Sequence, residues 1–408
     1  MSDPKRRVPI SPELLASVET QPERLAVMSR PDKLYIGVPK EVSKDEGRLV
    51  LVPSSVRNLV HHGHRIVIES GAGERAHFSD HAYSEAGAEI ARGPKEVYEA
   101  GIILKVSPPT LDELDYMRPD QVLISPIQLP LLTAEYMIKL KARRVIALAM
   151  EYIQDESGGF PVVRTLSELA GLSSILIASE LLSSSGRGKG VLLGGISGIP
   201  PARVVIIGAG VVAQSATRAA LGLGAEVRVF DDNIYKLKRL RREVGQSIFT
   251  SVLNPAYLAA ELQGADVAIG AIHSEDGRAP VVVSEGMVEG MSPGSVIIDV
   301  SIDQGGCFAT SEVTSLHRPT FVKHDVIHYC VPNLASRVAR TASVAVSNIL
   351  TPILLRAGST GAIRHVLFGS KGLRHGVYSY KGCITNQYLS ERFGQKYTDL
   401  GLLMTSEM

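Results

Sequence analysis

The sequence has no tryptophan, few other aromatic residues, and only three cysteines among its 408 residues. Scarce aromatic side chains argue against a surface that stacks nucleic-acid bases. Cys307, Cys330 and Cys383 have neither the spacing of a metal site nor the even number of a disulfide framework. We therefore expect reduced thiols in a cytoplasmic protein, and no metal site.

The sequence also lacks a strong charge imbalance and a long hydrophobic run. Its formal net charge is +1, which gives no general attraction to nucleic acid or membranes. No run reaches the roughly 18 apolar residues that a membrane span needs, and the N-terminal residues do not resemble a secretory signal. We expect neither nucleic-acid nor membrane partners. With 45% hydrophobic residues, the chain can form two domains with ordinary cores.

A dinucleotide-binding pattern is present at residues 204–213. Val204-Val205-Ile206-Ile207 is typical of a strand buried in a parallel sheet, and a glycine-spaced turn follows it. In such a turn Gly208 permits the sharp bend, and Gly210 lets a pyrophosphate approach the N-terminus of the next helix. Ala213 lets that helix pack closely on the strand. The pattern predicts a Rossmann-type site.

The next predicted strand ends at Asp231, where such sites usually place the acid that binds the adenosine ribose. The carboxylates of Asp231 and Asp232 would repel a 2′-phosphate, and no arginine follows directly to receive one. These residues favour NAD over NADP as the cofactor.

Strands and helices alternate on both sides of this pattern, which is typical of parallel sheets covered by helices. We predict an α/β fold with two Rossmann-like, doubly wound parallel-sheet domains, linked by long helices and separated by a cleft. The predicted parts are a helical appendage at 1–33, with Ser11 as N-cap, and a substrate or catalytic domain at 34–163. Helices at 336–408 return to that domain, and residues 164–335 form the NAD-binding domain.

Two local predictions concern the boundaries of these elements. Leu49–Val52 is interpreted as a strand of the first domain. Thr165-Leu166-Ser167-Glu168 has the pattern of a capping box and predicts the start of a long helix that ends at the serines before Gly186. The helical stretch from Ser336 is expected to pack beside it.

Polar residues follow the predicted strands at positions where open parallel sheets bind ligands. The clearest case is Asp303, because a buried strand runs directly into this acid and a Gly-Gly turn. The complete set is Arg48, Lys105, Ser107, Gln128, Glu151, Asp303 and Asn333.

Several stretches resemble alanine dehydrogenase, and the similarity covers roughly residues 34–400. The first half is also similar to the NAD(H)-binding subunit of proton-translocating transhydrogenase. The matching stretches are Gly37-Val38-Pro39-Lys40-Glu41, Asp45–Arg48, Glu69-Ser70-Gly71-Ala72-Gly73, Leu104-Lys105-Val106, Ile207-Gly208-Ala209-Gly210, Ile302-Asp303-Gln304-Gly305-Gly306-Cys307, His324-Asp325, Tyr329-Cys330-Val331 and Asn333.

The resemblance implies oxidative deamination of L-alanine to pyruvate and ammonia with NAD, in a homo-oligomer that is a hexamer or a dimer. It implies that Arg48 binds the substrate carboxylate through a bidentate guanidinium pair. Asp303 would assist the amine and the attacking water, and Asn333 would line the substrate pocket. Ser167 would contact the cofactor together with the glycine turn and Asp231.

The sequence departs from the family pattern at two positions. The second lysine of the family's Lys-Val-Lys-Glu-Pro motif is Ser107, and the catalytic histidine is Gln128, which cannot transfer a proton at neutral pH. Lys105, Asp303 or a nearby histidine could then take over proton transfer. Two alternatives follow: a dehydrogenase for another amino or imino acid, or an NAD(H)-binding regulatory protein with impaired catalysis.

Overall fold

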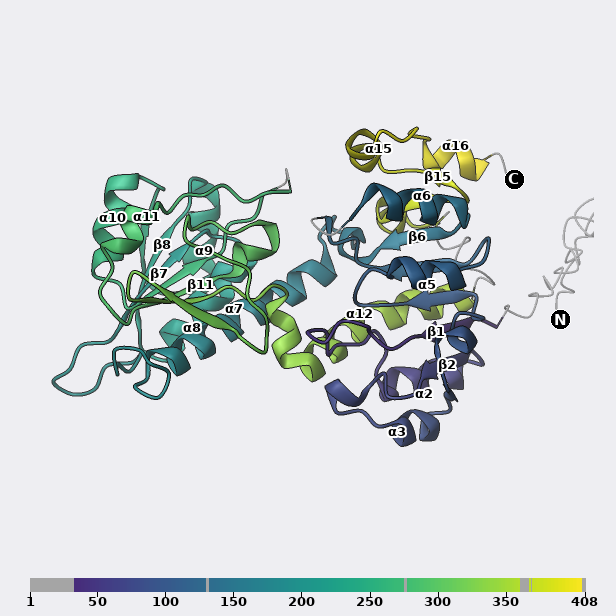
Figure 1. The fold of residues 1–408 in the computed structure, drawn as a ribbon, viewed down its shortest axis with the longest axis horizontal. Helices are drawn as coiled ribbons and strands as arrows, with labels where there is room; N and C mark the ends of the chain where they lie inside the picture. Colours follow the sequence, from purple (N-terminus) through teal and green to yellow (C-terminus); the bar gives the residue numbers. More distant parts are fainter. Residues whose placement is uncertain (1–32, 130–131, 275–276, 360–366, 368, 406–408) are drawn as a thin grey trace, which may run out of the picture.

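The computed structural model describes residues 33–129, 132–274, 277–359, 367 and 369–405. Its chain forms two lobes, each built around one sheet, and helices α7 (Pro161–Leu182) and α12 (Ala339–Ser359) run between them (Figure 1). The predicted helical appendage, including Ser11, lies outside the described residues.

The first lobe contains an eight-stranded sheet whose central strands are parallel. Its two strands from the end of the chain, β14 and β15, run antiparallel at one edge. Across the sheet the order is β15 (Cys383–Ile384), β14 (Val377–Tyr380), β6 (Ile146–Ala149), β5 (Val122–Ser125), β4 (Ile102–Leu104), β1 (Tyr35–Val38), β2 (Arg65–Glu69) and β3 (Glu89–Ala91).

Short helices connect these strands and cover the sheet. They are α2 (Pro53–His61), η1 (Glu74–Ala76), α3 (Asp80–Glu85), α4 (Pro94–Val97), α5 (Leu111–Tyr116), α6 (Ala134–Ala142), η3 (Met150–Tyr152), α14 (Lys371–His375), α15 (Gln387–Phe393) and α16 (Leu400–Thr405). Several start at residues that the sequence marks as caps; Thr110, for example, accepts the Glu113 N–H in a complete capping box at the start of α5.

The second lobe contains a seven-stranded sheet, parallel except for the edge strand β12. The order is β12 (Thr320–Lys323), β13 (Val326–Tyr329), β11 (Val296–Asp299), β10 (Val267–Gly270), β7 (Arg203–Ile207), β8 (Glu226–Phe230) and β9 (Phe249–Ser251). Its helices are α8 (Val211–Gly222), α9 (Ile234–Val244), α10 (Pro255–Gln263), α11 (Glu285–Glu289), η4 (Val300–Gln304) and η5 (Leu334–Val338).

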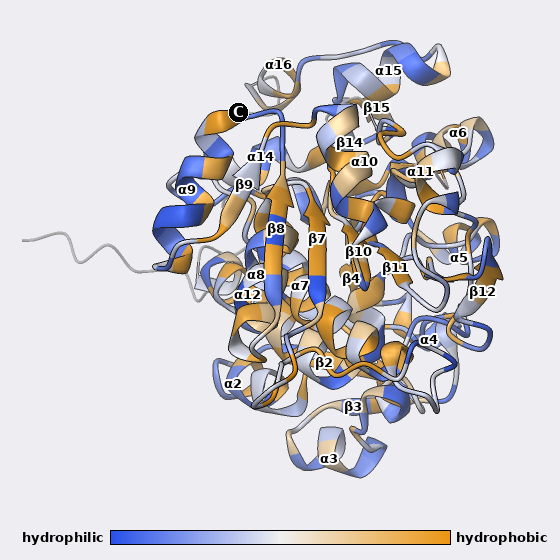
Figure 2. Ribbon diagram, turned by 90° about the vertical axis from the view of Figure 1, so that its left-hand side faces the viewer, coloured by the Kyte–Doolittle hydropathy of each residue, from blue (hydrophilic) through white to orange (hydrophobic). Residues whose placement is uncertain are grey.

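The hydrophobic strands form the core of each lobe. Figure 2 shows β7 and β8 as largely hydrophobic strands, while the neighbouring α9 is mostly hydrophilic. Val204, Val205, Ile206 and Ile207 are all fully buried, which agrees with the prediction of a strand covered on both faces. The predicted α/β fold with two such sheets is confirmed, although antiparallel edge strands make both sheets mixed.

Among the described residues, two segments have the length and apolar composition of a membrane span: α7, and residues Leu334–Ser359, which comprise η5 and α12. In each, 44% of the apolar window is buried inside the protein. They pack on each other, as predicted, and α7 packs extensively on α8. Their apolar composition therefore has a structural use within the two lobes.

Three local predictions were wrong. Leu49–Val52 is not a strand, because the N–H groups of Leu49 and Val52 donate to the Ser343 and Ser347 hydroxyls of α12 instead of a neighbouring strand. The Thr165–Glu168 pattern lies inside α7, which already begins at Pro161, a residue whose fixed φ favours the first helical position. The tail is not only helical, since β14 and β15 extend the first sheet.

The predicted boundary between residues 163 and 164 falls in the first turn of α7. The strands of the first sheet come from residues 35–149 and 377–384, and those of the second from residues 203–329. We propose that the catalytic and cofactor-binding parts follow this division.

Candidate functional site

The glycine turn after β7 depends on the absence of a side chain at Gly208. This residue has φ +114°, and a Cβ atom there would lie 2.4 Å from the Ala271 carbonyl oxygen, beyond the end of β10. Backbone geometry at the carboxyl edge of the second sheet therefore requires glycine at this position.

Gly210 is the N-cap of α8 and provides no side chain to bond the first N–H groups of that helix. A Cβ at Gly210 would meet no atom within 4 Å, so the space above the helix end is open. An uncapped helix N-terminus with open space suits an anionic pyrophosphate. Ala213 is fully buried and packs in the same core cluster as β7.

Asp231 follows β8 and connects to the glycine turn. Its Oδ2 accepts the Ala209 N–H at 2.7 Å, and its Oδ1 accepts the Asn233 N–H at 2.7 Å. These bonds fix the carboxylate beside the turn and leave lone pairs on both oxygens for ribose hydroxyls. The residues present thus fit a bound dinucleotide.

Ser167 lies on α7 one helical turn before Gly171. A Cβ at Gly171 would lie 2.3 Å from the Val212 carbonyl oxygen, so α7 crosses the first turn of α8 in close contact. Residues four apart share a helix face. Ser167, which is half-buried, is therefore on the face of α7 that packs against α8.

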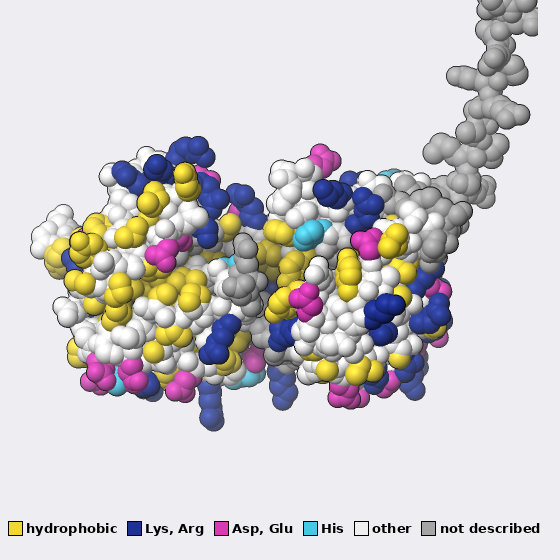
Figure 3. All heavy atoms as spheres, turned by 90° about the horizontal axis from the view of Figure 1, so that it is seen from above, with side chains coloured by type: hydrophobic (Ala, Val, Ile, Leu, Met, Phe, Trp, Pro, Cys, Tyr) yellow, Lys and Arg dark blue, Asp and Glu magenta, His cyan; other side chains and the backbone are white. Residues whose placement is uncertain are grey.

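A cavity of about 450 Å³ lies between the two lobes. In the view of Figure 3 a notch separates these lobes at the surface. One wall belongs to the first lobe and includes Lys105, Ser107 and Gln128; the other consists of residues 313–315 and 331–333 of the second. Of the predicted polar residues, Lys105, Ser107, Gln128 and Asn333 line this cavity, whereas Arg48, Glu151 and Asp303 do not.

Arg48 is 4% exposed and forms a bidentate ion pair with Glu46: its Nε and Nη2 lie 2.8 and 2.7 Å from the two carboxylate oxygens. Burial lowers the pKa of Arg48, but Glu46 outweighs it and holds this pKa above its ordinary value. The expected bidentate partner was a substrate carboxylate, so Glu46 takes the place that such a group would occupy. Among the described residues Nη1 has no partner.

Asn333 joins the two lobes at this point. Its Nδ2 donates to Glu46 Oε2 at 2.7 Å, and its backbone N–H donates to Asp303 Oδ1 at 2.8 Å. Asn333 has φ 56°, a left-handed conformation that asparagine tolerates better than most residues. The enclosing lobes displace water around Asp303 and raise the pKa of this carboxyl, although part of its side chain remains open to solvent.

Lys105 is 1% exposed and lies between two buried carboxylates, with Nζ 3.0 Å from Glu41 and 2.9 Å from Glu113. Burial lowers the pKa of Lys105, but the two carboxylates outweigh it and raise this pKa above its ordinary value. A lysine that keeps its proton cannot act as a base. The geometry favours a positioning role for Lys105 over the proton transfer that we considered from the sequence.

Ser107 and Gln128 both line the cavity, at the ends of β4 and β5. Gln128 has φ 49°, and its N–H group, like that of Ile127, points to the Glu151 carboxylate. Neither Ser107 nor Gln128 brings a positive charge into the cavity. The departures from the family pattern therefore lie where substrate chemistry would occur.

Three acidic residues of this region were not singled out from the sequence. Glu46 and Glu113 neutralise Arg48 and Lys105; the Thr-x-x-Glu spacing at 110–113 was a usable signal for Glu113. Asp299 is 1% exposed and accepts the Cys307 N–H at 2.8 Å and the Ser311 hydroxyl at 2.7 Å. It thereby fixes the turn that carries Asp303.

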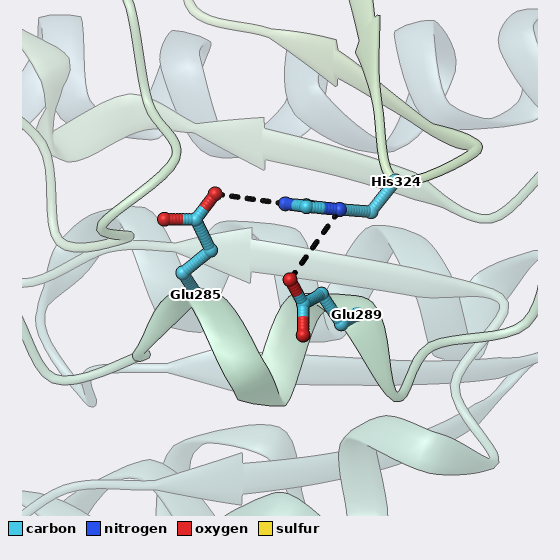
Figure 4. A group of neighbouring side chains, drawn as sticks. All are labelled: Glu285, Glu289 and His324. Atoms are coloured by element: carbon cyan, nitrogen blue, oxygen red, sulfur yellow. Dashed lines mark hydrogen bonds and ion pairs between the residues drawn. The ribbon is translucent and has the colours of Figure 1, made fainter.

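Glu285, Glu289 and His324 form a group of possible metal ligands on the surface of the second lobe (Figure 4). Glu285 already pairs with Lys323 and with His324, each at 2.8 Å. The group fixes the turn between β12 and β13 to α11, and exposed salt bridges of this kind are common without a metal. It does not support a metal site.

The fold and this geometry define a class: a two-domain α/β protein with a dinucleotide turn and, between its lobes, a charged cavity for a small molecule. Two family descriptions match the chain, "Alanine dehydrogenase/PNT, N-terminal domain" at residues 37–170 and "Alanine dehydrogenase/PNT, C-terminal domain" at residues 174–387. The chain belongs to the alanine dehydrogenase/PNT family, which confirms the resemblance stated from the sequence.

Individual relatives agree with this assignment. The alanine dehydrogenase of Bacillus subtilis is 38% identical over 365 residues, which cover 89% of this chain and 96% of the relative. A solved L-alanine dehydrogenase structure superimposes with a TM-score of 0.82 at 35% identity and covers 88% of this chain and 99% of its own. A transhydrogenase from Sinorhizobium meliloti shares the fold, with a TM-score of 0.74 at 23% identity, 86% of this chain and 99% of its own.

Proposed function

We propose that this protein is an NAD-dependent dehydrogenase that converts L-alanine and water to pyruvate and ammonium. The observation that carries the proposal is the network around Glu46, in which Arg48, Asn333 and Asp303 meet at the cavity from segments far apart in the sequence. The glycine turn lies at the same carboxyl edge of the second sheet as Asp303 and Asn333.

Each of these residues has a proposed task. Arg48 binds the substrate carboxylate through Nη1, or through its bidentate edge once Glu46 moves away. Asp303, fixed by the Asn333 N–H, accepts a proton from the substrate amine or from the attacking water. NAD, when bound, supplies the hydride acceptor, and we assign its binding to Gly208, Gly210, Ala213, Asp231 and Ser167.

The test follows NADH absorbance in both directions. NAD with L-alanine should produce NADH, and NADH with pyruvate and ammonium should consume it. No rate above background at saturating substrate in either direction would refute the proposal, while binding of NADH would separate a catalytic defect from a misfolded preparation.

A second candidate function is favoured by Ser107 and Gln128, because the cavity lacks the cation and the histidine of the family pattern. In that case the protein oxidises another amino or imino acid, or binds NAD(H) without turnover as a regulatory protein. A panel of amino acids and 2-oxo acids in the same assay separates these cases: preference for a substrate other than alanine supports the first, and binding without turnover supports the second.

We further propose that the protein works as a homo-oligomer, either a hexamer or a dimer. Leu172 and Leu176 on α7 are 46% and 62% exposed, and further exposed apolar residues, Leu192, Ile196 and Ile199, lie in the loop that follows. Contact with a second copy would remove this surface from water. Light scattering behind a sizing column measures the mass, and a monomer would refute this assignment.

A further inference from the structure

Glu151 is a carboxylate immediately behind the cavity wall, in η3 directly after β6. Its Oε1 accepts the Ile127 N–H at 2.6 Å and, more weakly, the Gln128 N–H at 3.4 Å. Its Oε2 is shielded from solvent and has no hydrogen-bond partner among the described residues. One oxygen thus holds the loop after β5, and the other is a buried polar atom without a bond.

This loop presents Gln128 to the cavity. Gln128 has φ 49°, a conformation that costs a side-chain-bearing residue energy unless its surroundings impose it. The Glu151 carboxylate accepts two successive backbone N–H groups, those of Ile127 and Gln128. The orientation of Gln128 therefore depends on Glu151.

Glu151 can exchange a proton near neutral pH. Burial raises its pKa to about 7, while its own N–H and those of Ile127 and Gln128 act in the opposite direction. Within the described part of the chain no cationic side chain pairs with this carboxylate to keep it ionised. Both protonation states are accessible in the range where the protein works.

Glu151 acts electrostatically on Tyr136 of α6, Tyr152 of η3 and Tyr378 of β14, and His375 of α14 lies beside Tyr152. Burial raises the pKa of each of the three tyrosine hydroxyls above the ordinary value for tyrosine, so they stay neutral near pH 7. The His375 ring bonds to the Tyr152 carbonyl oxygen at 3.1 Å. His375 is the histidine that contacts the residue after Glu151, so the experiment includes a variant of it.

We propose that Glu151 is a proton-controlled positioning residue of the substrate cavity: ionised, it holds the Ile127–Gln128 turn in place for the substrate, and protonated, it releases the turn. The proton comes from solvent and returns to it. A group that exchanges a proton near neutral pH thus lies behind position 128, where this sequence has glutamine. The choice of pyruvate as the ligand in the test rests on the proposed function.

The first experiment measures the dissociation constant of pyruvate from the protein–NADH complex by NADH fluorescence, which needs no turnover. A group with a pKa of about 7 is about nine-tenths protonated one unit below it. In the wild-type protein the constant should rise by up to about tenfold from about pH 8 to about pH 6. In Glu151→Gln, which keeps an acceptor oxygen but does not titrate, it should stay constant.

Two matched variants act as controls. Glu261→Gln changes another partly buried carboxylate, in the second lobe. Its Oε1 pairs with Arg228, and its Oε2 has no hydrogen bond among the described residues. This variant should keep the wild-type pH dependence of pyruvate binding. His375→Asn should keep it as well. The proposal is overturned if Glu151→Gln retains the dependence, or if His375→Asn loses it.

A second experiment requires no ligand. Because the pKa of Glu151 is raised on folding, its contribution to stability is largest below its unfolded-state pKa and is lost as the pH rises through about 7. The melting temperature of Glu151→Gln minus that of wild type should therefore increase from about pH 5 to about pH 8. A difference independent of pH overturns the proposal even if alanine is a substrate.

The two proposals fail in different ways. If the protein neither binds pyruvate nor shows turnover, the alanine assignment is refuted. If the melting difference nevertheless depends on pH, titration of Glu151 is supported. If Glu151→Gln does not fold, Glu151→Asp serves in its place. It still titrates but is one methylene shorter, so it should weaken pyruvate binding at both pH values, and unchanged binding would overturn the proposal.

Discussion

The proposed cofactor side and the proposed substrate side of the cleft are built on different principles. At the glycine turn the backbone itself forms the site, through the φ of Gly208, the open space at Gly210 and the uncapped end of α8. In the cavity, long side chains from distant segments form it, through buried pairs such as Lys105 with Glu41 and Glu113. A backbone site follows from a short local pattern, whereas a side-chain site can lose single groups, as Ser107 and Gln128 illustrate.

The largest loss of stability should come from a substitution in the cavity, the part of the site that side chains form. Lys105→Met would leave the Glu41 and Glu113 carboxylates buried without a counter-charge, which we expect to cost about 3–5 kcal/mol of stability. Chemical denaturation with two spectroscopic probes measures it. Lys139→Met is the control, because the Lys139–Asp115 pair is exposed to solvent and should contribute far less to stability. Equal losses would mean that burial does not matter here.

Restoring the two family residues should raise activity. Ser107→Lys combined with Gln128→His adds a cation beside the acidic cavity and a group that can transfer a proton, and we expect kcat/KM for alanine to increase about 10²-fold. Steady-state kinetics with each single variant divides this gain between binding and proton transfer. Ser107→Met serves as the control for size, and a comparable gain with it would contradict the role of charge.

At the glycine turn, the part of the site that the backbone forms, the addition of a single methyl group should change stability or NADH binding. Gly208→Ala introduces both an unfavourable φ and a contact with the Ala271 carbonyl, which should cost about 1–3 kcal/mol and abolish NADH binding. Gly210→Ala should leave the melting temperature unchanged, because its Cβ meets no atom, yet weaken NADH binding. Thermal denaturation and NADH fluorescence measure both effects. If Gly210→Ala binds NADH normally, the pyrophosphate does not lie at this helix end.

The smallest effect concerns the choice of cofactor. Asp231→Ala removes the proposed ribose acceptor and should weaken NAD binding about tenfold while reducing discrimination against NADP. Isothermal titration with both nucleotides measures it. Asp232→Ala changes the exposed acid next to it and should have little effect on NAD affinity. Equal losses in the two variants would show that only the total charge matters.

The sequence was sufficient for the fold because its signals are local. Val204–Ile207 and the glycine turn were predicted in place, since the residues of such a pattern lie within a few positions of one another. The same local rules failed at Leu49–Val52, where hydroxyls from α12, almost 300 residues away, replace a strand neighbour.

The site was predicted less completely for a related reason. Asp303 and Arg48 could be named from the sequence, but the carboxylates that neutralise or orient such groups, Glu46, Glu113 and Asp299, were not, although each is close in sequence to the group that it binds. A contact between two individual side chains leaves no periodic pattern in the sequence, whether its partners are near or far apart. The hold of Glu151 on the Gln128 turn belongs to the same category.

The position of β14 bears on how the polypeptide folds during its synthesis. This strand pairs with β6, whose residues are all buried, yet it is made about 230 residues later, after the whole second lobe has left the ribosome. Until then the edge of β6 has no partner, and unpaired strand edges promote aggregation. The nucleotide-binding lobe can fold first as a contiguous unit, whereas the first lobe must wait for the end of translation.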